Sequence, residues 1–183
     1  ARGYKNAKII LMIKGKKVLA VITARGGSKG LPGKNKKLLL GKPLVYYPLT
    51  TAQKSKYVDK VFLTTDDEEI KNIGEDLGVY CSELRPKELS DDKATSFSVL
   101  EYVLHHENIL GNNYEYIILL EPTSPLTQAM DIDSALEDLN DNYIVADSIV
   151  GISLTESSHP NFVVKLNSGN FIEAYNDKYT VQR

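Results

Sequence analysis

The sequence contains no tryptophan, two methionines and a single cysteine, Cys81, in 183 residues. One thiol can form neither an intramolecular disulfide nor a zinc cluster, which excludes a disulfide-rich or zinc-stapled small fold. The longest apolar runs, such as 18–22, have five residues, whereas a membrane-spanning helix needs about twenty. Lys14, Lys16 and Lys17 interrupt any candidate signal peptide. We therefore expect a cytoplasmic globular protein of roughly one domain.

Acidic residues are missing from the first 58 positions, which carry fourteen Lys or Arg and no Asp or Glu. The remaining residues carry all 24 acidic and eight basic side chains, so the two segments have formal charges of +14 and −16. Such asymmetry favours contact between the basic segment and a polyanion. The candidates are nucleic acid, a membrane surface and a nucleoside triphosphate, beside a lysine-rich face that is merely solvated. The eleven tyrosines are spread along the chain, which makes nucleic acid a weaker candidate.

Apolar runs typical of buried strands alternate with segments of helical period along most of the chain. Strands are predicted at 18–23, 61–65, 79–81, 116–120 and 146–152, and helices at 43–54, 66–77, 94–110 and 129–139. This alternation predicts a Rossmann-like α/β fold of three layers with a mostly parallel sheet. The ligand site should lie outside the carboxyl ends of the strands, among the loops after Thr23, Thr65 and Leu120.

The pattern changes in the C-terminal part of the chain. Segments 162–166 and 171–175 flank a polar turn and predict a β-hairpin. We therefore expect an N-terminal extension at 1–16, one main domain at 17–153, and the start of a hairpin arm at 154–183.

Local signals predict some details of the helices. Asp91 or Asp92 is expected to cap the helix at 94–110, and Pro48 to weaken or kink the helix at 43–54.

A loop rich in glycine and lysine, residues 24–35, directly follows the first predicted strand. Its four glycines allow backbone amides to approach an anion, and three cationic side chains stand among them. No two of these glycines are two residues apart, as a dinucleotide-binding fingerprint requires. Ser28 and Asn35 stand where a Walker loop ending in Gly33-Lys34 needs Gly and then Ser or Thr. The loop therefore predicts another kind of triphosphate cradle, with the layout of the sugar nucleotidyltransferases.

Three sequence motifs carry a resemblance to a known family. The segment ITARGGSKGLPGKN at 22–35 resembles the signature of the cytidylyltransferases that make CMP-activated nonulosonic acids, namely the N-acylneuraminate (sialic acid) enzymes and their legionaminate and pseudaminate relatives. RPKELSDDKATS at 85–96 is similar to the family's Arg-Pro-x-Glu-Leu motif, and LLEPTSPLT at 119–127 to its Pro-Thr-Ser-Pro-Leu motif. The resemblance makes 17–153 a nucleotide-binding cytidylyltransferase domain.

The resemblance also implies site residues. The first two motifs would bind CTP through Arg25, Gly26, Gly27, Ser28, Lys29, Lys34, Asn35, Arg85, Ala94 and Ser96. Arg25 and Lys34 would be the catalytic cations. The third motif lies near the acceptor sugar in the family, which implies sugar binding by Glu121, Pro122, Thr123 and Ser124. Glu121 departs from the glutamine that is common there, and a carboxylate at this place would repel an acidic sugar.

The implied reaction is attack of the sugar's anomeric hydroxyl on the α-phosphate of CTP, which gives a CMP-sugar and diphosphate. N-acetylneuraminate is the expected sugar, and Mg²⁺ is expected to bridge phosphate oxygens. The family's Asp-x-Asp metal motif lies beyond residue 183, so we expect a truncated chain that binds nucleotide without turnover. Asp131 and Asp133 have the same spacing but begin a predicted helix, on which residues two apart point to different sides. The expected partners are CTP, an acidic nine-carbon sugar and a second copy of the chain, with no nucleic acid and no membrane.

Some alternatives stay open. The chain could be a nucleotidyltransferase for another sugar, or a nucleotide-binding module without catalysis. Asp66 either faces the site or serves the start of a helix. His105 and His106 diverge by about 100° on their predicted helix and cannot chelate one metal together. Cys81 is expected to be a small buried apolar residue.

Overall fold

The computed structural model describes residues 13–28, 30–91, 93–152, 154 and 163–174. These residues belong to two compact units, which divide between Ser148 and Ile149. Most of the predicted N-terminal extension lies outside the described residues. None of the described helices is long and apolar enough to cross a membrane.

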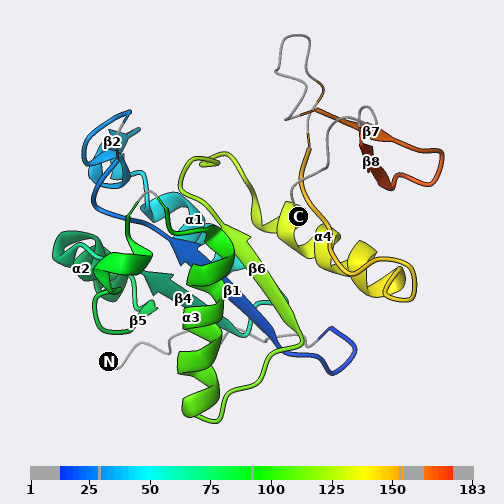
Figure 1. Cartoon of the computed structure of the whole chain (residues 1–183), viewed down its shortest axis with the longest axis horizontal. Coiled ribbons are helices and arrows are strands. Elements are labelled where there is room, and N and C mark those ends of the chain that lie inside the picture. Colours follow the sequence, from blue (N-terminus) through cyan, green and yellow to red (C-terminus); the bar gives the residue numbers. More distant parts are fainter. Residues whose placement is uncertain (1–12, 29, 92, 153, 155–162, 175–183) are drawn as a thin grey trace, which may run out of the picture. The chain divides into compact units, whose positions relative to one another are not determined.

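The first unit is built on a four-stranded sheet in the order β5-β4-β1-β6, with every neighbouring pair parallel. The strands are β1 (Val18–Thr23), β4 (Lys60–Thr64), β5 (Tyr80–Cys81) and β6 (Tyr116–Leu120). β1 lies inside the sheet, where Val21 pairs with Phe62 of β4 and with Leu119 of β6. Because the strands run in one direction, the loops after them meet at one edge of the sheet (Figure 1). The predicted parallel α/β fold is confirmed.

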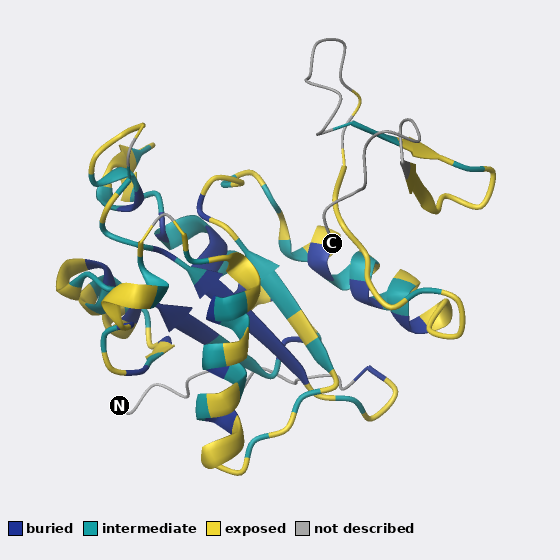
Figure 2. Ribbon diagram, viewed as in Figure 1, coloured by how far each residue is buried: buried dark blue, intermediate teal, exposed yellow. Residues whose placement is uncertain are grey.

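Helices cover both faces of this sheet. They are α1 (Tyr46–Lys54), α2 (Glu68–Asp76), α3 (Ser96–Ile109) and α4 (Ala129–Asp141). Ala20 of β1 belongs to an apolar cluster with Leu49 of α1 and Ile70 of α2, whereas Val21 packs in a second cluster with Val103 of α3. Successive residues of β1 therefore serve opposite layers, and Figure 2 shows this strand buried while β6 is mostly half-buried.

Four short elements connect these layers. They are the 3-10 helices η1 (Lys34–Lys36) and η2 (Lys87–Leu89), and the paired strands β2 (Leu38–Leu39) and β3 (Lys42–Pro43). The predicted start of the first helix at residue 43 is therefore wrong, because Pro43 pairs with Leu38 in an antiparallel ladder. Pro48 lies in the first turn of α1, where its missing N–H has no helical partner to lose, so the helix runs on to Lys54.

The start of α3 differs from the prediction in its capping residue. The Thr95 side chain caps the helix and accepts a hydrogen bond from the Ser98 amide at 3.1 Å. Asp91 instead accepts hydrogen bonds from the amides of Lys93 and Ala94 in the preceding turn. Asp92 lies outside the described residues. An aspartate four residues before Thr95 serves a turn because threonine already occupies the capping position.

The predicted strand at 146–152 is wrong. The amides of Val145 and Ala146 both donate to the Asn142 carbonyl in a turn that follows α4. Ile149 and Ile152 are exposed, and none of the residues at 146–152 pairs with a strand in the part of the chain that the structure describes. An apolar run becomes a strand only where a neighbour completes its hydrogen bonds, and the sequence pattern does not contain that information.

The second unit contains the predicted hairpin, formed by β7 (Val164–Leu166) and β8 (Ile172–Ala174). Its turn is held by Asn167, whose side-chain oxygen accepts hydrogen bonds from the amides of Gly169 and Phe171. The hairpin is confirmed, and its role as a dimer arm stays a prediction.

Candidate functional site

A cavity of about 550 Å³ opens at the carboxyl edge of the sheet. Its walls come from the loop after β1, the segment 85–99 that leads into α3, and the loop after β6. The topology predicts this place, because an open parallel sheet exposes its loops beyond the strand ends. The three segments also carry the three motifs found in the sequence.

The loop after β1 is fastened by hydrogen bonds to neighbouring segments. The Gly26 amide donates to Asp66 Oδ1 at 2.8 Å, and Asn35 Nδ2 donates to the Arg25 carbonyl at 2.9 Å. A Cβ atom at Gly26 would lie 2.6 Å from Asp67 Oδ2, so only glycine fits this close approach. Gly33, with φ of 64°, supplies the left-handed turn that starts η1. These contacts give the loop a defined path around the cavity.

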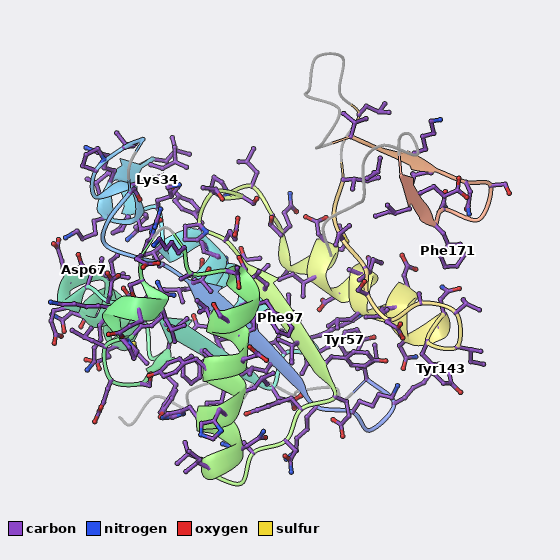
Figure 3. All side chains as sticks on the ribbon, viewed as in Figure 1. Lys34, Tyr57, Asp67, Phe97, Tyr143 and Phe171 are labelled. Carbon is purple, nitrogen blue, oxygen red and sulfur yellow. The ribbon has the colours of Figure 1, made fainter. Side chains whose placement is uncertain are left out.

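Three cationic side chains line the cavity, namely Arg25, Lys34 and Arg85 (Lys34 is labelled in Figure 3). Arg25 Nη1 donates to the carbonyl of Asp91, which also lines the cavity, at 3.3 Å. Lys34 forms no ion pair with any residue that the structure describes. The cavity therefore has a strong preference for an anion.

Arg85 is the most deeply placed of these cations, with 5% of its surface exposed. Its amide donates to the Thr65 carbonyl at 2.7 Å, and its Nε donates to Ser90 Oγ at 3.1 Å. Burial lowers the pKa of the Arg85 guanidinium, and the charge of nearby Asp66 opposes that change. A guanidinium remains charged after such a shift, so Arg85 brings a weakly hydrated positive charge to the cavity.

The N-terminus of α3 adds to this positive potential. Ala94, Thr95 and Ser96 line the cavity at the start of the helix, where the amides of the first turn have no carbonyl acceptor within the helix. Val99, one turn further, adds an apolar surface together with Leu89. A ligand with an anionic part and a flat apolar part suits this combination.

One buried acceptor in the cavity wall lacks a partner. Asn35 Oδ1 forms no hydrogen bond within the described part of the chain, although Asn35 is 5% exposed and lines the cavity. A buried polar atom of this kind is costly unless something donates to it. A ligand hydroxyl or amino group would satisfy it.

The loop after β6 forms the remaining wall through Glu121, Pro122 and Thr123. The Ser124 amide donates to the Glu121 carbonyl in a turn, and Thr123 Oγ1 donates to Glu121 Oε2 at 3.4 Å. Glu121 is exposed at the cavity surface.

Ten of the predicted site residues line this one cavity, and they are Arg25, Ser28, Lys34, Asn35, Arg85, Ala94, Ser96, Glu121, Pro122 and Thr123. Gly26, Gly27 and Ser124 lie in the same loops but are not part of the lining, and Lys29 lies outside the described residues. Sequence reasoning missed seven lining residues: Thr23, Gly30, Leu31, Leu89, Asp91, Thr95 and Val99. Val99 was detectable, because it stands three positions after Ser96 on a helix.

The neighbouring Asp67 decides whether Asp66 serves the start of α2. Asp67 caps α2, since its Oδ1 accepts from the amides of Glu69 and Ile70. Burial opposes ionisation of Asp67, but Lys36 and the helix amides outweigh it and lower its pKa. Asp66 is therefore not the helix cap, and its carboxylate binds the loop after β1 instead.

The other candidate groups have structural partners. Asp131 completes a capping box with Gln128 at the start of α4, and Asp133 accepts from Ser55 Oγ at 2.6 Å. His105 is exposed, while His106 packs edge-on against Phe62. None of these residues joins the cavity.

Magnesium would find few protein ligands in the cavity. Among the described residues, no three His, Cys, Asp or Glu side chains are grouped as a metal site. Asp91 and Glu121 line the cavity as carboxylates, and Oδ1 of Asp91 is engaged by two amides. Mg²⁺ commonly binds one or two carboxylates and takes its other ligands from water and substrate phosphates, and this donor set fits that arrangement.

The fold and the cavity define a class of protein, an α/β domain with a cavity lined by cationic side chains at the carboxyl edge of a parallel sheet. The sequence model of the family described as cytidylyltransferase matches residues 19–177. The chain therefore belongs to the cytidylyltransferase family.

Curated relatives act on several acidic sugars. The chain is 40% identical over 121 residues to N-acylneuraminate cytidylyltransferase of Escherichia coli O18:K1:H7, covering 66% of this chain and 28% of that protein. It is 33% identical over 168 residues to pseudaminic acid cytidylyltransferase of Campylobacter jejuni, covering 91% and 71% of the two chains. CMP-N,N'-diacetyllegionaminic acid synthase of Legionella pneumophila is 33% identical over 121 residues, covering 66% and 52%.

A solved structure shares the fold. A CMP:2-keto-3-deoxy-manno-octonic acid synthetase complexed with CTP has a TM-score of 0.58 and 25% identity, and the match covers 69% of this chain and 48% of that one. The chain thus spans about half of that structure and 28% of the Escherichia coli relative.

Proposed function

We propose that this chain is the nucleotide-binding part of a cytidylyltransferase that activates a nonulosonic acid with CTP. The observation that carries the proposal is the single cavity in which side chains from all three motifs meet. Membership of the cytidylyltransferase family supports the nucleotide, and relatives named for sialic, pseudaminic and legionaminic acids support the sugar class. N-acetylneuraminate is the first sugar to test among the three.

The cavity groups have distinct tasks in this proposal. Arg25, Lys34 and Arg85 neutralise the triphosphate, together with the amides at the start of α3. As the sugar hydroxyl attacks the α-phosphorus, negative charge grows on the departing diphosphate oxygens, and cations already in place stabilise it. Asn35 Oδ1 accepts a hydrogen bond from the nucleotide, for which a ribose hydroxyl is the nearest chemical match. Val99 and Leu89 offer the base an apolar surface.

Mg²⁺ belongs to the proposal as a partner of the phosphates, with Asp91 and Glu121 as the carboxylates that could hold it. When bound, it would screen the triphosphate charge and favour departure of the diphosphate. The residues of the chain keep their own tasks, which are to bind the phosphates and to hold the loop after β1 around them.

A thermal-shift series tests the nucleotide. We expect CTP with Mg²⁺ to raise the melting temperature more than UTP or GTP at equal concentration, because binding to the native state alone stabilises it. Stabilisation by UTP without stabilisation by CTP would overturn the assignment. Diphosphate release with CTP and a panel of nine-carbon acidic sugars then identifies the sugar.

A second candidate is a nucleotide-binding module that does not turn over. CTP binding without diphosphate release would support this module, and release with any acidic sugar would exclude it.

A further inference from the structure

The turn after β4, residues 64–67, contacts two walls of the cavity. The Thr64 carbonyl accepts a hydrogen bond at 3.1 Å from the amide of Ala24, the first residue of the loop after β1. The Thr65 carbonyl accepts from the Arg85 amide at 2.7 Å. Two adjacent backbone carbonyls therefore hold the first residue of the loop after β1 and the first residue of the segment 85–99. This turn itself does not line the cavity.

Asp66 adds a side-chain contact to the first of these walls and a negative charge close to the second. Its Oδ1 accepts from the Gly26 amide at 2.8 Å, inside the loop, and its charge lies close enough to Arg85 to favour the charged guanidinium. The neighbouring Asp67 takes over helix capping, so the Asp66 carboxylate is not needed for α2. A carboxylate that accepts from a backbone amide forms a charge-assisted hydrogen bond, which fixes the path of the chain more firmly than a neutral one.

We propose that Asp66 is a positioning residue of the triphosphate site, which holds the Gly26 amide, and with it the loop after β1, in the arrangement that the phosphates require. The inference rests on the proposed function for the identity of the ligand. Asp66 does not line the cavity, so it acts on the ligand through the loop after β1. Displacement of a phosphate-binding group by about 1 Å is enough to weaken binding and slow the reaction severalfold or more.

Two substitutions separate the hydrogen bond from the charge. Asp66→Ala removes both, and we expect the dissociation constant for CTP to rise about tenfold in calorimetric titration, as for loss of one charge-assisted hydrogen bond. Asp66→Asn keeps an oxygen acceptor for Gly26, and we expect it to stay within about threefold of the unsubstituted chain. If the alanine variant does not fold, Asp66→Ser replaces it, because the serine side chain is too short to reach the Gly26 amide. We expect the same loss of CTP affinity.

The matched control is Asp76→Asn, which removes an exposed charge from the other end of α2. We expect no change in CTP affinity there. Amide hydrogen exchange gives a second readout: exchange at Gly26 should speed up in Asp66→Ala and stay slow in Asp66→Asn. A residue that served only stability would lower the melting temperature while the folded protein kept its affinity for CTP and its protection at Gly26.

The outcomes distinguish the inference from the proposed function. If the unsubstituted chain binds CTP and Asp66→Ala binds it equally well, the positioning role is wrong while the proposed function stands. If Asp66→Asn weakens CTP as much as Asp66→Ala, the hydrogen bond to Gly26 is not the cause, and the inference fails. If the unsubstituted chain does not bind CTP at all, the proposed function falls and the inference falls with it.

Discussion

Polar clusters lie at both ends of the strands in the central sheet, at its amino edge and at its carboxyl edge. The two clusters differ in how their charges are paired. At the amino edge, Lys60 begins β4 and places its ammonium 2.8 Å from both carboxylate oxygens of Glu107 on α3. Glu107 is fully buried, and it also accepts hydrogen bonds from Asn112 and from the hydroxyl of Tyr114. Burial, followed by the charge of Glu107, raises the pKa of Tyr114, so that hydroxyl stays a donor.

At the carboxyl edge, the described residues that line the cavity include more basic than acidic side chains. Of these described residues, Arg25, Lys34 and Arg85 are basic, and Asp91 and Glu121, both exposed, are acidic. Burial works against the charge of Arg85, as the lowered pKa shows. Excess charge at this edge costs stability unless an anion arrives.

The pairing of charges distinguishes a cluster that stabilises this domain from a cluster that binds a ligand. The Lys60–Glu107 cluster closes on itself, because each charge has an opposite partner within hydrogen-bond distance. The cavity cations instead line an open cavity, and Lys34 among them forms no ion pair with any residue that the structure describes. We therefore expect substitutions at the amino edge to change the free energy of unfolding, and substitutions at the carboxyl edge to change ligand affinity.

The largest expected effect is at the amino edge. Glu107→Ala leaves the Lys60 ammonium, Asn112 and Tyr114 without their acceptor, and we expect the free energy of unfolding to fall by about 3 kcal/mol. Urea denaturation measures this loss. Glu101→Ala, at an exposed position on the same helix, is the matched control and should change stability by less than about 0.5 kcal/mol. A loss below about 1 kcal/mol for Glu107→Ala would contradict the stabilising role assigned to the cluster at the amino edge.

The second effect is at the carboxyl edge. Lys34→Ala should weaken CTP about tenfold or more, because the lost charge-assisted contact falls on phosphates, while the free energy of unfolding changes little. CMP lacks the outer phosphates and should lose less affinity in the same titration. Lys37→Ala, an exposed lysine just after η1 that does not line the cavity, is the control. Equal weakening of CTP and CMP would contradict the role assigned to Lys34.

The location of the binding edge was predictable from the sequence because periodicity and direction are local properties. Alternation of strands and helices fixes a parallel sheet, and a parallel sheet gathers the loops after its strands at one edge. The loops containing Lys34 and Glu121 could therefore be assigned to one site although 87 positions separate them. The structure brings both to the same cavity.

Contacts between segments were not predictable in the same way. Asp66 and Asp67 are adjacent and chemically identical, and only the turn after β4 decides that Asp67 caps the helix while Asp66 reaches Gly26. The choice of Thr95 over Asp91 as the cap of α3 has the same cause. The buried pairing of Lys60 with Glu107 depends on how α3 packs across the sheet, which no motif records.

The smallest expected effect concerns Cys81 on β5, a titratable group that belongs to neither cluster. Burial raises the pKa of its thiol from an ordinary value near 9 to about 11. In the unfolded chain the thiol ionises first as the pH rises, so the unfolded state holds fewer protons there and the native state loses stability. The contribution of Cys81 is thus complete below about pH 8 and declines as the pH approaches 11.

We expect the free energy of unfolding to fall by about 1 kcal/mol or less between pH 8 and pH 10 on account of Cys81, because the thiol is only half-buried. Other groups also contribute to the pH dependence of stability, so the measurement is a difference between the unsubstituted chain and Cys81→Ser, in which their contributions cancel. The serine variant should lose less stability over the interval. A steeper loss in Cys81→Ser would mean that the folded chain stabilises the thiolate, and Cys81 would then belong with the charged edge of the sheet rather than with its core.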